Sequence, residues 1–237
     1  MAHLSRIAAP KLWDITRKGR RWIIRTSPGP HKIDFSTNLS ILLRYILSYS
    51  NSQRDVKKIV NSGDVKVDLK VRKDIHFPVG LMDTVSFDKL DENYRILLNK
   101  KGKIALAKIT KEESTKKPFK ILGKTLLKNK KIQLNLSNGR NIFVNQDNYN
   151  VSDTIVLDLT SNKIIEHIPF KEGSLIYLTG GNKIGQIGKL NSITSASGTQ
   201  PSKVVFTLGK TKHETLKEYA FVIGTDKTSI TLLENES

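Results

Sequence analysis

From about residue 88 onward, the chain consists of short segments in which apolar and polar residues alternate, with turn-forming residues between them. Alternation with a period of two is typical of a β-strand that has one buried face. Short strands that follow one another this closely indicate an antiparallel barrel or sandwich. Asn138-Gly139 is the clearest two-residue turn among them. The predicted strands are 94–99, 103–110, 132–136, 141–145, 154–159, 163–168, 203–208, 218–223 and 228–233.

A glycine-rich segment at 173–193 raises the question of a nucleotide site. A phosphate-binding loop needs a lysine and then a serine or threonine after its second glycine, but Gln186 and Ile187 follow Gly185. The dinucleotide fingerprint G-x-G-x-x-G is absent as well. Strand-like residues flank the glycines, so we expect a β-loop-β element in which glycine permits positive φ or close backbone approach. Two interpretations of this element remain, a hairpin without a ligand and a loop that touches RNA or protein.

Residues 38–87 have a different pattern. Apolar residues at helical spacing predict two short helices within 38–62, and Ser52 with Asp55 resembles a capping box for the second. Residues 61–63 are typical of a helix end. The segment 64–72 alternates strictly, which predicts one continuous strand with Leu69 on the same face as the valines before and after it. Further alternation predicts strands up to residue 87.

The net charge points to a polyanionic partner. The chain has 40 lysines and arginines against 22 acidic residues, a formal charge of +18. Such an excess repels itself in a compact protein, and nucleic acid is the polyanion that most simply neutralises it. An anionic membrane is the second possibility, but the sequence has no apolar run approaching ~18 residues. The chain also has no cysteine, which fits an intracellular protein, and no signal-peptide pattern at its start.

Basic residues are concentrated in the first 33 positions, which hold eight of them and one acidic residue, Asp14. Both tryptophans of the chain, Trp13 and Trp22, lie in the same segment. Cations suit phosphates and flat aromatic rings suit bases, so this composition is typical of an arm that becomes ordered on RNA. A solvated, disordered tail is the alternative.

A second group of cations falls on the predicted helices and strand. Arg54, Lys57 and Lys58 share one face of the second helix, opposite apolar residues. The alternation of the following strand puts Lys66, Lys70 and Arg72 on its outer face. We expect these consecutive elements to form an RNA-docking surface, although a solvated charged face is the plainer alternative.

Catalytic patterns are absent. The five histidines stand far apart in the sequence. His213-Glu214 begins the pattern of a zinc protease, but Lys217 stands where the second histidine is needed and would repel a metal ion. There is no G-x-S-x-G elbow. We therefore expect no catalytic residue, no metal site, no cofactor and no small-molecule substrate.

The opening segment 3–31 resembles the start of the S4e family, the small-subunit ribosomal proteins that archaea and eukaryotes share. The residues that carry this resemblance are Arg6, Ala8-Ala9-Pro10-Lys11, Trp13, Arg17-Lys18, Trp22 and Ser27-Pro28-Gly29-Pro30-His31. Residues 56–85 resemble the S4-type RNA-binding domain of that family, which commonly has glycine where this chain has Leu69. The segment 173–190 resembles a KOW motif. Its matching positions are Gly173, Ile176, Leu178, Gly181, Gly185 and Gly188.

Pattern and resemblance together predict an α+β fold in four parts. These are a basic N-terminal extension (1–37), a small αα-β RNA-binding domain (38–87), an antiparallel β central domain (88–168) and an SH3-like KOW β-barrel with C-terminal strands (169–237). In the barrel, Gly181, Gly185 and Gly188 are expected to shape the loop. The residues expected to bind RNA are Arg6, Lys11, Arg17, Lys18, Arg20, Arg21, Trp22, Arg25, His31, Lys32, Arg54, Lys57, Lys58, Lys66, Lys70, Arg72, Lys73, Lys183 and Lys189.

The resemblance implies a structural protein of the small ribosomal subunit in the cytoplasm, bound to ribosomal RNA and to neighbouring ribosomal proteins, without a membrane. Two alternatives are open. KOW motifs also occur in transcription factors, and S4-type domains occur in RNA-modifying enzymes, although the short hairpins after residue 88 do not look like a catalytic domain.

Overall fold

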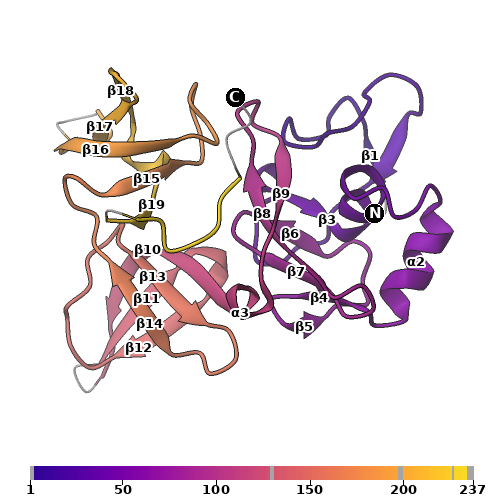
Figure 1. Cartoon of the computed structure of the whole chain (residues 1–237), viewed down its shortest axis with the longest axis horizontal. Helices are drawn as coiled ribbons and strands as arrows, with labels where there is room; N and C mark the ends of the chain where they lie inside the picture. Colours follow the sequence, from indigo (N-terminus) through magenta and orange to yellow (C-terminus); the bar gives the residue numbers. More distant parts are fainter. Residues whose placement is uncertain (1–2, 129–130, 197–199, 226, 234–237) are drawn as a thin grey trace. The chain divides into compact units, whose positions relative to one another are not determined.

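The computed structural model describes residues 3–128, 131–196, 200–225 and 227–233. It divides into two compact units, one formed by residues 1–115 with 232–237 and the other by residues 116–231. Antiparallel sheets dominate both units, and the helices are few and short (Figure 1). The predicted α+β class is confirmed at this level.

The N-terminal segment of the first unit is folded on itself. Strands β1 (His3–Ser5) and β2 (Trp22–Ile24) form an antiparallel hairpin, and the residues between them turn back to bury Trp13. Ala9, Ile23 and Ile41 are buried in the same cluster. The segment expected to be an arm therefore has its own apolar contacts with the first helix.

Two short helices follow as predicted. A 3-10 turn η1 (Ile33–Phe35) leads to β3 (Ser36–Asn38), and α1 (Leu39–Ile41) continues as a π-helical turn η2 (Leu42–Ile46). Helix α2 (Gln53–Asn61) begins at Ser52, whose hydroxyl accepts a hydrogen bond from the backbone N–H of Arg54. It ends before Gly63, which has a φ of 85°. The apolar periodicity accounts for the buried sides of both helices.

The main sheet of this unit has five strands in the order β5-β4-β7-β8-β9. A separate pair joins β3 to β6. A short helix, α3 (Lys111–Ser114), follows β9. The strands are β4 (Val65–Val67), β5 (Lys70–Val71), β6 (Pro78–Gly80), β7 (Thr84–Phe87), β8 (Glu92–Leu98) and β9 (Ile104–Lys108).

The prediction of one continuous strand over 64–72 is wrong. Asp68 and Leu69 have φ values of 50° and 63°, and they form a two-residue turn between β4 and β5. Consecutive positive φ values are typical of the hairpin turns whose twist matches that of the strands. Because the chain reverses here, Leu69 does not continue the buried row of Val65 and Val67.

The second unit begins with a five-stranded antiparallel sheet in the order β12-β11-β10-β13-β14. Its centre is the longest strand of the described chain, β10, which the alternation pattern did not predict. Asn138 and Gly139, both at positive φ, make the predicted turn between β11 and β12. The strands are β10 (Lys116–Leu126), β11 (Ile132–Leu136), β12 (Asn141–Val144), β13 (Thr154–Asp158) and β14 (Ile164–Ile168).

A second five-stranded sheet completes this unit, in the order β18-β17-β16-β15-β19. Val156 and Ile168 of the first sheet share one buried cluster with residues of the second, including Phe206. The predicted strand at 228–233 is wrong, because the described part of that segment makes only a single bridge, Gly224 to Thr228. The strands are β15 (Leu175–Leu178), β16 (Ile187–Thr194), β17 (Lys203–Leu208), β18 (Thr211–Leu216) and β19 (Ala220–Gly224), with a 3-10 turn η5 (Lys217–Tyr219) before the last.

The four-part division expected from the sequence is finer than these two units. Its boundary between residues 87 and 88 falls within the β7–β8 hairpin, and its boundary between residues 168 and 169 falls inside the second unit. The four domains therefore stay a prediction.

Candidate nucleic-acid interface

The expected RNA-binding cations of the N-terminal segment divide into two groups. Six side chains are exposed to solvent and are available to phosphates. They are Lys11, Lys18, Arg20, Arg21, Arg25 and Lys32. The other three, described next, are used by the protein itself.

Arg6 is only 5% exposed. Its guanidinium donates hydrogen bonds to the carbonyl and hydroxyl oxygens of Thr16, at 2.8 and 3.1 Å, and to the hydroxyl of Tyr45 at 2.7 Å. Arg17 donates to four backbone carbonyl oxygens of residues 6–10. These two arginines hold the segment in its folded form, as multiple donors in a fixed fork allow.

His31 lies inside the first unit. Its Nε2 is 2.8 Å from a carboxylate oxygen of Asp83, which also accepts a hydrogen bond from the backbone N–H of Gly80. A Cβ at Gly80 would lie 2.4 Å from the imidazole, so glycine is needed for this contact. The pair ties the N-terminal segment to β6.

The two tryptophans have opposite environments. Trp13 is fully buried, and its indole N–H donates a hydrogen bond of 2.6 Å to the carbonyl of Ser36. Trp22 is 53% exposed, and the guanidinium of Arg21 lies over its ring at 4.9 Å. Trp22 alone of the two can offer a flat surface to a base.

Helix α2 presents the cationic face that its spacing predicted. Arg54, Lys57 and Lys58 are exposed, while Val56 and Val60 are completely buried. The cations thus lie on the solvent side of a helix held by its apolar side. Asp55 lies on the exposed surface of the same helix and is its one acidic residue.

The cations around the β4–β5 hairpin are more varied. Lys66 forms an ion pair with Asp88 at 2.7 Å, and the guanidinium of Arg72 lies 4.2 Å from the ring centre of Phe77. Lys70 and Lys73 are exposed. The turn at Asp68 places Lys70 on β5, which runs antiparallel to the strand of Lys66, and Arg72 follows β5, so the three do not form the single row expected from the sequence.

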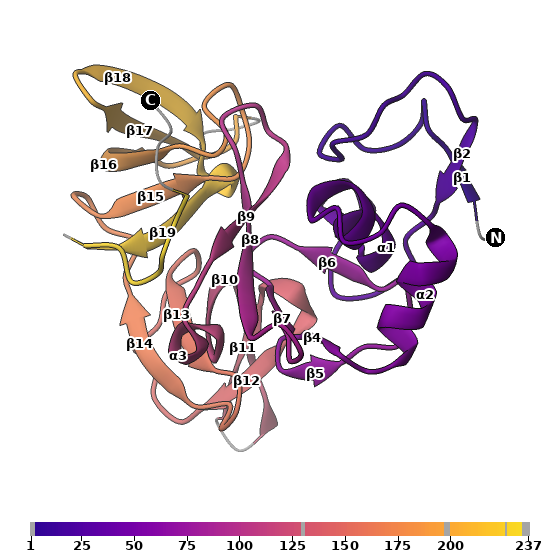
Figure 2. The same cartoon turned by 45° about the vertical axis from the view of Figure 1, so that its right-hand side comes forward.

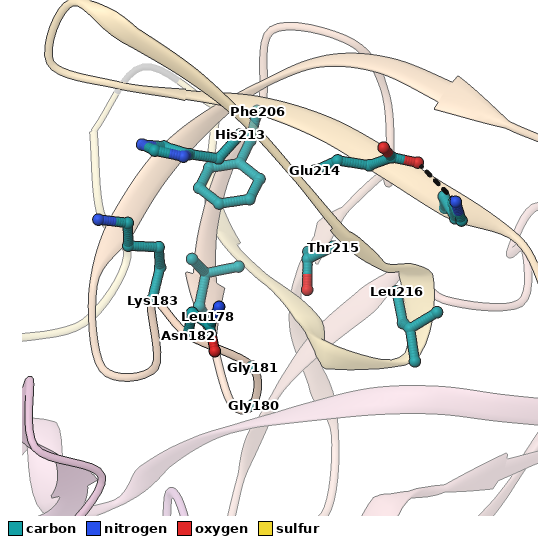
Figure 3. A pocket seen from close by; sticks show the side chains of 11 residues that line it. Leu178, Gly180, Gly181, Asn182, Lys183, Phe206, His213, Glu214, Thr215 and Leu216 are labelled. Atoms are coloured by element: carbon teal, nitrogen blue, oxygen red, sulfur yellow. Dashed lines mark ion pairs between the residues drawn. The ribbon is translucent and has the colours of Figure 1, made fainter.

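The glycine-rich loop connects β15 to β16 and borders a hollow of about 440 Å³. Lys183 enters it from the loop and His213 from β18, next to the ring of Phe206 (Figure 3). Gly181 and Gly185 have φ values of 82° and 75°. Lys189 is exposed on β16.

Gly188 serves a different purpose in this loop region. A Cβ there would lie 2.7 Å from the ring of Phe206 and 3.1 Å from the carbonyl oxygen of Thr207. The glycine lets β16 approach β17 closely, as expected for a glycine inside a strand.

Sequence reasoning missed three cations with distinct environments. Arg44 lies within an apolar helical segment and packs its guanidinium over Tyr45 at 5.1 Å. Lys117 and Lys120 are buried in β10. Burial lowers the pKa of Lys120 to about 8, and its ammonium donates to the carbonyl oxygens of Lys217, Glu218 and Ala220. Nothing in the local sequence separates these residues from surface cations.

Within the described ranges, no group of three or more histidine, cysteine, aspartate or glutamate side chains could hold a metal ion. No helix in the part of the chain that the structure covers is long and apolar enough to cross a bilayer. The features that remain are exposed cations and one exposed tryptophan, which suit phosphates and bases.

Known proteins share both the sequence and the fold. Models of the ribosomal family S4e and of the RS4NT domain match residues 90–164 and 2–34. Small ribosomal subunit protein eS4 of Methanosphaera stadtmanae is 40% identical over 231 residues, covering 98% of this chain and 95% of that protein. The eS4 protein of Archaeoglobus fulgidus is 36% identical over 222 residues, covering 94% and 93%. The crystal structure of 30S ribosomal protein S4e from Thermoplasma acidophilum has a TM-score of 0.72 at 31% identity, covering 83% of this chain and 98% of that one.

Proposed function

Because the chain belongs to the S4e family of ribosomal proteins, we propose that it is a structural constituent of the small ribosomal subunit that binds ribosomal RNA. The observation that carries the proposal is the similarity to eS4 proteins over nearly the whole chain. The family consists of structural proteins rather than enzymes. The formal charge of +18 supports the same function, since ribosomal RNA supplies the anions that this excess requires.

Three surfaces supply the proposed RNA contacts. The first is the exposed cations of the N-terminal segment together with Trp22, the second is the α2 face with the β4–β5 hairpin, and the third is the loop after β15 with Lys183 and Lys189. Arg6, Arg17 and His31 are left out of the direct contacts, because each already donates to or contacts other groups of the protein and none is fully exposed. Phosphate contacts of this kind position a protein on RNA and supply most of its affinity.

The finer domain assignments are part of the proposal. Residues 38–87 would form the S4-type RNA-binding domain, and the second sheet of unit two would be the KOW-type, SH3-like barrel. Positive φ at Gly181 and Gly185 and the close approach at Gly188 support the KOW assignment. Neighbouring ribosomal proteins in the cytoplasmic ribosome would be the remaining partners.

The test is binding of the purified chain to small-subunit ribosomal RNA over a series of salt concentrations. We expect log K to fall linearly with log salt, by about 0.7 to 0.9 for each neutralised phosphate. The chain should also sediment with the small subunit after a moderate salt wash. Sedimentation with RNA polymerase instead would favour a transcription factor, and new modified bases in the RNA would favour an enzyme.

A further inference from the structure

A small cleft in the first unit is lined by residues of the β1–β2 hairpin and of the helical segment that follows. Figure 2 shows the backbone of these elements, with β1 paired to β2 and α1 in the same unit. Its volume is about 150 Å³, so it admits a group much larger than one water molecule. We call it the hairpin cleft. The lining residues that matter here are Arg6, Arg20, Trp22, Arg44, Tyr45 and Gln53.

Three arginines line the hairpin cleft. Arg6 and Arg20 come from the N-terminal segment and Arg44 from η2. No aspartate or glutamate lines the cleft, and within the described residues none of the three arginines forms an ion pair. A concentration of like charges without counter-charge is unfavourable in the protein alone and attracts an anion.

Arg6 makes this imbalance sharper because it is buried. The oxygens that it contacts belong to Thr16 and Tyr45 and are all uncharged, and its Nε has no hydrogen-bond partner in the described structure. A buried charge without a counter-ion costs free energy that a bound anion would recover. Arg6 is among the residues that line the cleft, so an anion bound there would lie next to it.

Tyr45 holds two of these cations in position. The guanidinium of Arg6 lies 5.7 Å from the centre of its ring and that of Arg44 lies 5.1 Å away. Cation–π contact and the hydrogen bond from Arg6 to the tyrosine hydroxyl restrict both side chains before any ligand arrives. Less conformational entropy is then lost when an anion binds.

Trp22 identifies the kind of anion. Trp22 lines the cleft and is 53% exposed although its side chain is large and apolar, and the guanidinium of Arg21 lies over its ring. An exposed tryptophan next to guanidinium groups suits a base attached to a phosphate, because bases stack on aromatic rings and arginine binds phosphate through paired donors. An acidic side chain of a protein would satisfy the arginines but leave the ring unused.

We propose that the hairpin cleft binds one phosphodiester group of single-stranded RNA through Arg20 and Arg44, with the adjoining base stacked on Trp22. This site rests on the proposed RNA-binding function and adds to it a specific nucleotide position. Arg6 acts behind the site, where it positions Tyr45 and contributes positive charge.

The two tryptophans make the site observable. Trp13 is buried, so its emission should stay constant, whereas Trp22 should be quenched when a base stacks on it. The probe is a short single-stranded oligouridylate, titrated into the full chain at low salt. Inorganic phosphate, added as a competitor, should relieve the quenching only at high concentration, because it lacks the base.

Variants of the cleft should weaken this binding. Trp22→Ala should raise Kd for the oligouridylate by about 5- to 150-fold, which is the usual range when one stacked base loses its aromatic partner. Since that variant lacks the fluorescence of Trp22, its Kd is measured by filter binding. Trp22→Phe should abolish the signal but keep most of the affinity. Arg44→Gln should raise Kd by about 10-fold or more, as expected when a charged hydrogen bond is removed.

The controls separate this proposal from the wider function. Lys111→Gln removes one exposed cation of the same unit outside the cleft and should leave quenching unchanged. Arg20→Gln is a second test at an exposed residue, in case Arg44→Gln unfolds the helical turn. If the wild-type chain binds small-subunit ribosomal RNA but the cleft variants bind it and the oligouridylate as tightly as wild type, the cleft proposal is overturned alone. If the wild-type chain binds no ribosomal RNA, the proposed function itself fails.

Discussion

The indole N–H of Trp13 donates a hydrogen bond of 2.6 Å to the backbone carbonyl of Ser36, where both residues are completely buried. This contact joins the N-terminal segment to the strand that precedes α1. A basic segment that composition alone would allow to be a disordered arm is thereby anchored to the fold. Its exposed cations are then held on a fixed surface.

Trp13→Ala should lower the free energy of unfolding by about 3 to 5 kcal/mol, because it removes a fully buried aromatic side chain. Trp13→Phe keeps most of the volume but leaves the buried Ser36 carbonyl without this donor, which should cost about 1 to 3 kcal/mol. Urea unfolding of the full chain measures both changes. Trp22→Ala is the matched control and should change stability by less than about 0.5 kcal/mol, as for other exposed positions.

Gly188→Ala should destabilise the protein by about 1 to 3 kcal/mol, because its Cβ would overlap the ring of Phe206 in a closely packed sheet. Gly123→Ala is the control in the neighbouring sheet. Its Cβ would lie no closer than 3.8 Å to another atom, so the substitution should be neutral or slightly stabilising. Equal thermal stability of the two variants would show that the close approach at Gly188 is relaxed in solution.

Alternation in the sequence identified most strands but failed where charge and turn chemistry were unusual. β10 was missed because lysines at 116, 117, 120 and 124 hide its pattern, and only the folded protein shows that Lys117 and Lys120 lie inside. The turn at Asp68 and Leu69 was missed because leucine rarely adopts positive φ. Both failures come from tertiary contacts that overrule local preference.

The candidate interface was predictable to a similar degree. The exposed cations of α2 follow from helical spacing, since apolar residues on one side fix the other side toward solvent. Arg6 and Arg17 could not be separated from surface cations, because their partners are backbone carbonyls and neutral oxygens brought close by folding. Arg44 was missed for a different reason. It lies in an apolar helical segment, where the sequence pattern predicts buried residues and not a cationic surface.

Leu69→Gly should stabilise the protein by up to about 1 kcal/mol. A non-glycine residue in the left-handed region costs about 1 to 2 kcal/mol, and part of that gain is offset by the greater entropy of glycine in the unfolded chain. Leu69→Val should instead be destabilising, since a β-branched residue tolerates positive φ poorly. Chemical unfolding of wild type and the two variants gives the order of their stabilities. A glycine variant less stable than wild type would mean that burial of the leucine outweighs its backbone strain.

Reversing the charge of the α2 face, with Lys57→Glu and Lys58→Glu together, should weaken binding to ribosomal RNA. The slope of log K against log salt should become shallower by about 0.7 to 0.9 for each phosphate that the helix no longer neutralises. Both side chains are exposed, so helix content measured by circular dichroism should not change. Filter binding at several salt concentrations gives both the affinity and the slope.

The matched control for that double variant is Lys100→Glu with Lys101→Glu, an adjacent exposed pair outside the proposed surfaces. It changes the net charge by the same amount. If the two double variants weaken RNA binding equally, the effect comes from overall charge and α2 is not a specific contact.

Lys120 makes the stability of the protein depend on pH. Burial lowers the pKa of its ammonium group from 10.5 to about 8, so between these values the unfolded chain binds more protons than the folded one. The free energy of unfolding should therefore rise with pH across this window, by up to about 3 kcal/mol, and the penalty is fully present below pH 8. Lys120→Met removes the titrating group. The difference in the free energy of unfolding between wild type and this variant therefore isolates the contribution of Lys120 from that of the surface lysines. Urea unfolding of both proteins from neutral pH to about pH 10 tests this, and a difference that stays constant with pH would show that the three backbone carbonyls keep the ammonium charged throughout.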